Sequence, residues 1–152
     1  MIVTQPKVFI SSTIEDLPNE RKAAHNAVRK VGAFPVMSET TMSAQNEDSL
    51  TACLNKVKES DIYVLILGGR YGWQPFGTES ITELEFQTAQ DCKLPILVFN
   101  TTYQKEDLQK DFAKRAEAIR FRKTVSDAFE LETAIENSLQ EEIEKKTERV
   151  FW

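Results

Sequence analysis

The sequence predicts an α/β fold, in which an open parallel sheet of five strands, in the order 2-1-3-4-5, carries helices on both faces. Short apolar segments alternate with amphipathic helical segments in units of about 25 to 30 residues, as in parallel sheets connected by helices. Residues 62–67 are continuously apolar, which is typical of a central strand covered on both faces. Right-handed crossovers then favour the order 2-1-3-4-5.

The first two strands are predicted at residues 7–11 and 33–37, which are short and apolar. The helix between them is expected to begin with Asp16 as its N-cap and to carry Pro18 in its first turn, where the missing N–H does no harm. Gly32 is expected to end this helix.

A polar loop over residues 38–48 is followed by a helix for which Ser49 is the predicted N-cap. The third strand, residues 62–67, leads through a loop rich in glycine and aromatic residues to a further helix. Ser80 and Glu83 fit an S-x-x-E capping box at the start of that helix.

The fourth strand is predicted at residues 94–99 and is followed by a helix over residues 106–121. A short, weak fifth strand falls near residues 122–126, and the last helix is expected to begin at about Phe129. The buried stripe predicted for the helix over residues 106–121 consists of Leu108, Phe112, Ala116 and Ile119.

The length of 152 residues suits a single domain with one good core. The net charge of −5 argues against electrostatic binding of nucleic acid. No apolar run reaches the roughly 18 residues of a membrane span, and no charged-then-apolar leader precedes Lys7. We therefore expect a cytoplasmic protein that binds neither nucleic acid nor membranes. The apolar ending, residues 150–152, favours continuation into a further domain, so that residues 1–152 would be the N-terminal module of a longer protein.

Cys53 and Cys92 lie on the apolar faces of two predicted helices and are expected to be buried, reduced thiols. The one histidine, His25, lies at the edge of a polar helix face and is expected to be solvated. Without a His/Cys cluster no metal site is predicted, and a Ser-His-Asp triad is hard to build.

Glu83 and Glu85 lie two residues apart but have different predicted roles. Glu83 projects opposite the apolar stripe of its helix and is expected to face water. Glu85 falls about 40° from Ile81 around the helix, inside that stripe. An unpaired carboxylate there would cost roughly several kcal/mol. The sequence leaves two interpretations open, a functional site and a structural ion pair.

Arg21 falls beside the buried stripe of its helix, one turn in. It is a candidate partner for a carboxylate near the edge of the sheet. An arginine that lies along the surface is the alternative interpretation.

Ligands of open parallel sheets bind beyond the carboxyl ends of the strands, where the strand order reverses. This places Ser11, Ser12 and residues 68–77 at one crevice, into which Glu85 projects. The two hydroxyls and the backbone N–H groups around Gly69 suit phosphate or ribose oxygens.

Three further side chains of this loop have candidate roles. Arg70 suits a phosphate or the Glu85 carboxylate. Tyr71 or Trp73 offers a stacking surface for a flat base, and packing within the loop is the alternative. The segment GGRYG matches neither the dinucleotide-binding fingerprint nor the P-loop, so an ordinary turn is also open.

The segments VFISS, DLPNER, SDIYVLILGGRYGW and SITELEFQTA together resemble the TIR-like domains of unknown function found ahead of NACHT or repeat modules. The resemblance covers about residues 7–99. More distantly, the layout is similar to Toll/interleukin-1 receptor (TIR) domains and to nucleoside deoxyribosyltransferases. This resemblance implies a flavodoxin-like fold with a site near the ends of the first and third strands.

In catalytic TIR domains and in the transferases, a glutamate on the helix after the third strand acts on an N-glycosidic bond. It is typically followed four residues later by a small residue, and Glu85 with Ala89 matches that spacing. The chain departs from the pattern at Ile81, where NAD-cleaving TIR domains often carry tryptophan. The aspartate-rich nucleoside-binding signature of the transferases is not clearly present either.

The leading hypothesis is a TIR-like, nucleotide-binding effector domain that hydrolyses NAD or a related nucleotide at its N-glycosidic bond. NAD would be a substrate, and no cofactor is expected. The alternative is a catalytically inactive module that signals through self-association into a homo-oligomer. The predicted catalytic residue is Glu85. The residues predicted to hold phosphates, ribose and base are Ser11, Ser12, Gly69, Arg70, Tyr71 and Trp73.

Overall fold

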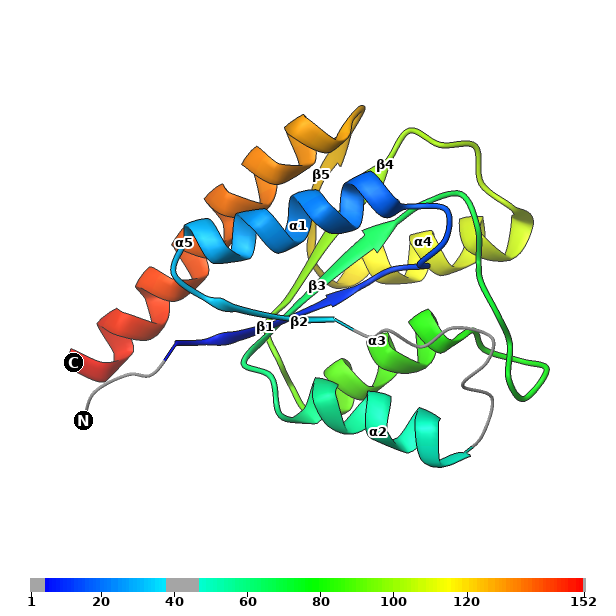
Figure 1. Ribbon diagram of the computed structural model, residues 1–152, viewed down its shortest axis with the longest axis horizontal. Helices are drawn as coiled ribbons and strands as arrows, with labels where there is room; N and C mark the ends of the chain where they lie inside the picture. Colours follow the sequence, from blue (N-terminus) through cyan, green and yellow to red (C-terminus); the bar gives the residue numbers. More distant parts are fainter. Residues whose placement is uncertain (1–4, 38–46, 152) are drawn as a thin grey trace.

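The computed structural model describes residues 5–37 and 47–151, and its centre is a five-stranded parallel sheet (Figure 1). The strands lie in the order β2-β1-β3-β4-β5, which confirms the predicted topology. All four neighbouring pairs are parallel. The strands are β1 (Lys7–Ser11), β2 (Phe34–Met37), β3 (Ile62–Leu67), β4 (Ile96–Thr101) and β5 (Phe121–Val125).

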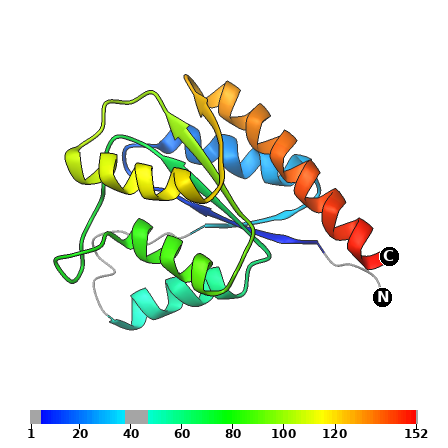
Figure 2. The same ribbon diagram turned by 180° about the vertical axis from the view of Figure 1, so that it is seen from behind.

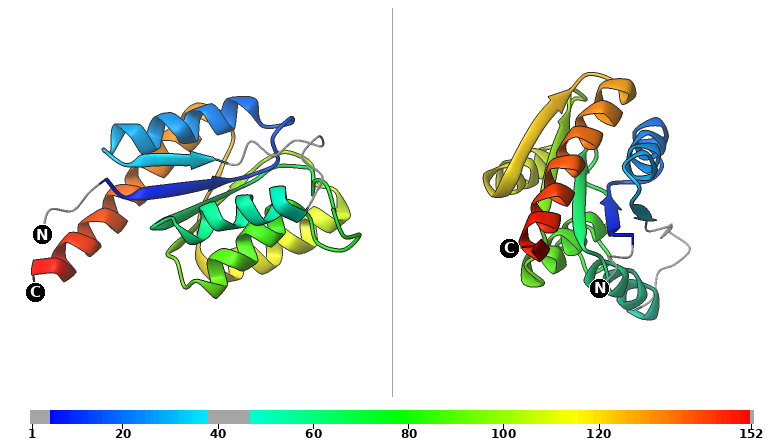
Figure 3. Two further views of the ribbon diagram at one scale, coloured as in Figure 1. Left: turned by 60° about the horizontal axis from the view of Figure 1, so that its bottom comes forward. Right: turned by 90° about the vertical axis from the view of Figure 1, so that its left-hand side faces the viewer.

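The helices cover both faces of the sheet, as predicted. In Figures 1 and 2, and most clearly in the left view of Figure 3, α1 and α5 lie on one face and α2, α3 and α4 on the other. None of these helices combines the length and the apolar character needed to cross a membrane, within the residues that the structure describes. The helices are α1 (Pro18–Lys30), α2 (Glu47–Lys58), α3 (Ile81–Asp91), α4 (Asp107–Arg120) and α5 (Ala128–Phe151).

β3 is buried along its whole length, and its alternating side chains enter two separate clusters of the core. Val64 and Ile66 pack on the side of α1 and α5. Tyr63 and Leu65 pack on the side of α2, α3 and α4. Burial of each large apolar side chain contributes about 1.5–3 kcal/mol, so the two clusters hold the sheet between its helix layers.

The position of the candidate site follows from the register of the two central strands. Ser11, the last residue of β1, lies opposite Leu65 of β3. The chain leaves β1 toward α1 on one face and leaves β3 toward α3 on the other. The carboxyl ends of β1 and β3 therefore flank the switch point where parallel sheets of this kind bind ligands.

Two predicted helix starts are wrong by a few residues. α1 follows Leu17 at its N-cap, with no side-chain cap, in place of Asp16, because the Leu17 side chain is fully buried and fixes the entry of the chain. α2 begins at Glu47, ahead of the predicted cap Ser49. The end of α1 is as predicted, since Gly32 follows it with a φ of 80°. Most of the loop predicted at residues 38–48 lies outside the described residues.

The buried stripe predicted for α4 is partly wrong. Leu108 and Ile119 are 51% and 48% exposed, whereas Phe112 and Ala116 are fully buried, as predicted. Gln109 is buried in place of Leu108, because its amide Nε2 donates a hydrogen bond to the Gly68 carbonyl at the end of β3. A polar contact to the loop thus sets the rotation of the helix at its amino end.

Cys92 is exposed, which corrects the prediction that both thiols are buried. α3 ends at Asp91, and Cys92 is its C-cap, so the helical projection on which the prediction rested no longer applies there. Cys53 is buried and reduced, as predicted. The side chains of residues 150–152, on which the predicted continuation of the chain rests, lie outside the described part.

Candidate active site

Glu85 lies on the face of α3 that packs against the sheet, as the helical projection predicts, and its side chain is 2% exposed. Each of its carboxylate oxygens accepts a hydrogen bond from a different element. The Ser11 hydroxyl at the end of β1 donates to Oε1 at 2.7 Å. The Cys53 thiol on α2 donates to Oε2 at 2.8 Å. Together with α3, which carries Glu85, the donors on β1 and α2 hold one buried carboxylate at the carboxyl end of β1.

Arg21 lies on α1, on the opposite face of the sheet from α3, and contributes positive charge near this carboxylate. It is buried on α1, and its Nη1 donates to the Ser12 hydroxyl at 3.0 Å. Its charge favours the ionised form of Glu85 and so lowers the pKa of that carboxyl group. This burial excludes the interpretation of Arg21 as an arginine along the surface.

The pKa of Glu85 is raised from 4.5 to about 7, and burial in a medium of low polarity is the largest cause. The hydrogen bonds from Cys53 and Ser11 and the charge of Arg21 oppose that rise. The carboxyl group consequently changes its protonation state near neutral pH, where general acids and bases and carboxylate nucleophiles work.

Tyr63 adds a fourth polar group beside Glu85. Its side chain is fully buried, and its hydroxyl has no hydrogen-bond partner within the described residues. Burial raises the pKa of Tyr63 well above its usual value, and the neighbouring charge of Glu85 raises it further. We call the group Ser11, Arg21, Cys53, Tyr63 and Glu85 the Glu85 site.

The glycine- and aromatic-rich loop after β3 lies at the same end of the sheet and packs closely on the β4–α4 connection. A Cβ atom at Gly69 would lie 2.4 Å from the Gln104 carbonyl oxygen, so the backbone approach requires glycine. The Gly69 carbonyl accepts from the Glu106 N–H, and the Tyr71 N–H donates to the Glu106 carboxylate at 2.9 Å. These contacts fix the loop at its base.

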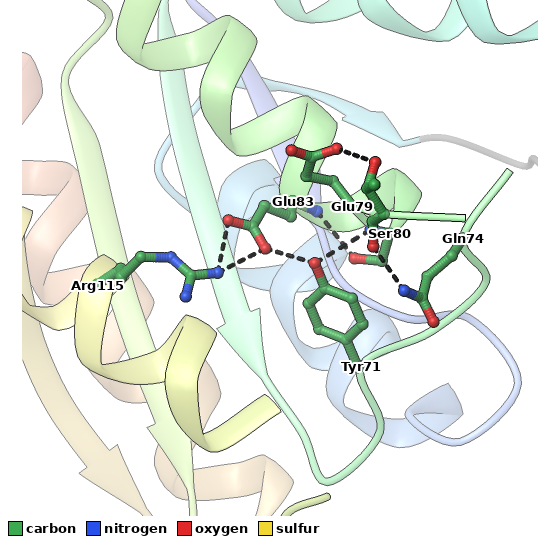
Figure 4. Close-up of polar contacts among 7 residues, drawn as sticks. Tyr71, Gln74, Glu79, Ser80, Glu83 and Arg115 are labelled. Carbon is green, nitrogen blue, oxygen red and sulfur yellow. Dashed lines mark hydrogen bonds and ion pairs between the residues drawn. The ribbon is translucent and has the colours of Figure 1, made fainter. Parts of the chain in front are cut away.

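Glu83 is buried, and the prediction that it faces water is wrong. Its carboxylate accepts a hydrogen bond from the Tyr71 hydroxyl and is paired with Arg115 of α4 at 2.7 Å (Figure 4). The Tyr71 hydroxyl in turn accepts from the Ser80 N–H at 3.2 Å. Of the predicted capping box, the Ser80 half is confirmed, since its hydroxyl accepts from the Glu83 N–H, whereas the Ser80 N–H is bonded to the Tyr71 hydroxyl in place of the Glu83 carboxylate. Partners on α4 and on the loop, which the helical projection could not include, explain why Glu83 is inside.

The predicted binding residues divide into two groups in the structure. Ser11 and Ser12 lie with Arg21 and Glu85 at the carboxyl end of β1. The Tyr71 ring packs against Phe112, edge to face, and its hydroxyl contacts Glu83, which supports loop packing for this aromatic. The remaining three residues, half-buried Gly69 and Trp73 and exposed Arg70, lie on the loop after β3.

Sequence reasoning missed Cys53 and Tyr63 as members of the site. Both lie in apolar stretches and read as ordinary core residues. The sequence indicates a role for Cys53 only when this residue is considered together with Glu85. A buried carboxylate needs hydrogen-bond donors, and a thiol on the neighbouring helix can be one. The described residues include no group of three or more His, Cys, Asp and Glu side chains that could hold a metal ion.

Comparison with known proteins places this geometry in context. A family model described as a domain of unknown function matches residues 7–149. No curated protein matches the chain. A CMP N-glycosidase of Clostridium botulinum, BcmB, aligns with 11% identity and a TM-score of 0.58, over 87% of this chain and 98% of its own.

Two further solved structures share the architecture. The heterodimer of the RPS4 and RRS1 TIR domains aligns with 16% identity and a TM-score of 0.57, over 90% of this chain and 97% of that one. A flavo di-iron protein from Thermotoga maritima aligns with 15% identity and a TM-score of 0.58, over 90% of this chain but only 36% of its own. At these identities the likeness establishes a flavodoxin-like, TIR-like fold.

Proposed function

The chain belongs to the DUF4062 family of domains of unknown function, and we propose that it hydrolyses the N-glycosidic bond of a nucleotide, with NAD as the first substrate to test. The observation that carries the proposal is the buried Glu85 carboxylate, held by donors at the carboxyl end of β1. Packing of the core does not require an acidic side chain at this position, and burying one lowers the stability of the fold.

One carboxylate is sufficient for this reaction when the leaving group is cationic. Ordinary glycosidases use two, one of which protonates the departing oxygen. The nicotinamide of NAD takes the electron pair of the C1′–N bond and leaves as a neutral base. Glu85 would stabilise or capture the electron-poor ribose carbon, and water would then add to that carbon and release a proton.

The neighbouring side chains suit the rest of a nucleotide. The Ser12 hydroxyl and the Arg21 guanidinium, which are hydrogen-bonded to each other, would bind a phosphate. Ser11, Gly69 and Arg70 keep their predicted role toward ribose and phosphate. Tyr71 would support that role indirectly, because its N–H and its hydroxyl are bonded to Glu106 and Glu83 and hold the loop. Trp73 would stack the base. The fold shared with a CMP N-glycosidase supports this class of chemistry, and CMP is therefore the second substrate to test. Its cytosine carries no positive charge and leaves with a proton, which the neutral acid form of Glu85 would donate as water adds to the ribose carbon and releases a proton.

The test is release of free base from NAD and from CMP by concentrated protein, measured by chromatography. Glu85→Gln keeps the size of the side chain and removes its charge. Asp91→Asn makes the same chemical change on an exposed residue at the end of the same helix. We expect Glu85→Gln to lower base release about 100-fold or more, and Asp91→Asn to stay within about twofold of the wild type.

Equal activity of the two variants would contradict the role of Glu85. If the wild-type protein releases base from neither nucleotide at concentrations where light scattering detects self-association, the proposed reaction is wrong for these substrates.

A second candidate function is a self-associating signalling module. Its supporting observation is a set of exposed apolar side chains on α4, β5 and α5: Phe129 is 82% exposed, and Leu108, Ile119 and Phe121 are between 43% and 51% exposed. Apolar side chains of this exposure are available for protein–protein contacts. The TIR domains that share this fold were solved as a heterodimer, which supports the same function.

A further inference from the structure

We propose that Cys53 is a positioning residue for Glu85, whose thiol holds the carboxylate in one orientation and favours its ionised form. This inference deepens the proposed function, because it assigns to α2 a direct part in the chemistry of the site. The thiol forms no disulfide, Cys53 is 3% exposed, and its Sγ lies 2.8 Å from Oε2 of Glu85.

The geometry gives the two donors of Glu85 separate tasks. Ser11 fixes Oε1 from β1, and Cys53 fixes Oε2 from α2. A carboxylate with one donor on each oxygen cannot rotate about its last bond without breaking both hydrogen bonds. Cys53 therefore sets which lone pairs of Glu85 remain directed at a bound substrate.

Four elements supply a group that acts on the charge of Glu85. Arg21 from α1 and Cys53 from α2 stabilise the negative charge, and the Ser11 hydroxyl from β1 does so as a neutral donor. Tyr63 from β3 is neutral at ordinary pH, because burial raises its pKa well above the usual value. A substitution at Cys53 removes one donor to Glu85 and changes only the edge helix α2. The residues of β1 and β3 stay as they are.

Because of the position of α2, its contact with Glu85 can be altered without changing the central strands. Figures 1 and 3 show α2 beside α3 at the outer side of the helix layer. Val57 lies one turn beyond Cys53 on the same buried stripe of α2, is fully buried, and belongs to the cluster that packs under the sheet. Val57→Ala is therefore a matched control that loosens the packing of α2 but leaves the thiol in place.

The first measurement needs no substrate. Infrared difference spectra follow the protonation of Glu85 against pH, and Glu85→Gln identifies its band. We expect Cys53→Ala and Cys53→Val to move the midpoint upward by about one pH unit, since a donor to the charged form is lost. Cys53→Ser, which keeps a donor, and Val57→Ala should leave the midpoint close to that of the wild type, at about pH 7.

The second measurement is the pH profile of kcat/KM for base release. The rising limb should move upward in Cys53→Ala and return in Cys53→Ser, whereas Val57→Ala should lower stability without moving the limb. Because alanine could prevent folding, valine at position 53 provides a second variant that lacks a donor but leaves no cavity, and it is compared with serine, which keeps a donor.

The outcomes separate the two proposals. If the wild type cleaves no nucleotide but the infrared midpoint moves in Cys53→Val and not in Cys53→Ser, the positioning role holds and the reaction is wrong. If the midpoint is the same in Cys53→Val, Cys53→Ser and the wild type, the positioning role is overturned, whatever the activity.

Discussion

The surroundings of Glu85 act on its charge in opposite directions. Burial favours the neutral acid, whereas Ser11, Cys53 and Arg21 favour the carboxylate, and burial prevails. The protein thus keeps an acidic side chain in its core at the expense of stability, which is common where a charged group serves a function.

The raised pKa of Glu85 makes the stability of the protein depend on pH. The pKa of Glu85 is 4.5 as a reference and about 7 in the folded protein, so the folded state holds its proton longer than the unfolded chain. The contribution of Glu85 to stability is therefore greatest below about pH 4.5, falls as the pH rises to about 7, and is constant above that. Relative to the wild type, Glu85→Gln should gain up to about 3 kcal/mol in free energy of unfolding between these limits.

Urea unfolding of both proteins at pH 5 and pH 8 measures this gain. A difference between the two proteins that is the same at both pH values would contradict the raised pKa of Glu85.

At the scale of single residues, the sequence predicts which residues are anomalous better than it predicts their partners. Glu85 could be placed inside because its angle on the helix depends only on local geometry. Its donor Cys53 could not, because that contact depends on how α2 packs beside α3. Glu83 shows the same limit, since Tyr71 and Arg115, which hold it inside, lie 12 and 32 residues away.

The loop after β3 and the start of α3 act as one unit, held by the Tyr71 hydroxyl (Figure 4). Tyr71→Phe removes the donor to Glu83 and the acceptor for the Ser80 N–H, both of which are buried. We expect a loss of about 1–3 kcal/mol in the free energy of unfolding, because a buried N–H is left without its partner.

Thr78→Val is the control for this prediction, since Thr78 lies in the same loop and its exposed hydroxyl also contacts a glutamate, Glu79. It should change the free energy of unfolding by no more than about 0.5 kcal/mol in the same urea experiment. An equal loss in both variants would mean that the Tyr71 hydroxyl does not hold the loop.

At the scale of elements, apolar runs predict strands well, and helix faces are predicted less well where polar contacts intervene. The run over β3 has the predicted bounds, and the short β5 is present. The face of α4 differs because Gln109 reaches the Gly68 carbonyl, a contact between segments 41 residues apart that no local periodicity reports.

The sheet has two edge strands, β2 and β5. The self-association hypothesis predicts that copies meet at the β5 edge and not at the β2 edge. The β5 edge carries Phe129 beside it, at the start of α5, and the β2 edge carries Phe34, which is 51% exposed. If copies assemble through the β5 side, Phe129→Ser should shift the concentration of half-assembly upward about tenfold or more, as expected for an apolar anchor of an interface.

Phe34→Ser should leave that concentration unchanged. Light scattering across a dilution series measures both variants, and an equal shift in the two would contradict the choice of the β5 side.

The order of the sheet was predictable because it depends on global rules of chain connection that hold across parallel sheets. What the sequence did not predict at this scale is which segments surround Glu85. Its two donors come from β1 and α2, 74 and 32 residues away along the chain, and only the assembled fold brings them together.

The contact between α2 and the carboxylate has a consequence for control of the molecule. A helix at the margin of a domain can be displaced by a binding partner at little cost to the rest. A shift of α2 by an ångström or two would draw the sulfur away from the acid and raise its affinity for a proton, while the strands stay in place. A partner that binds α2 from outside the domain would thereby adjust the reactivity of Glu85.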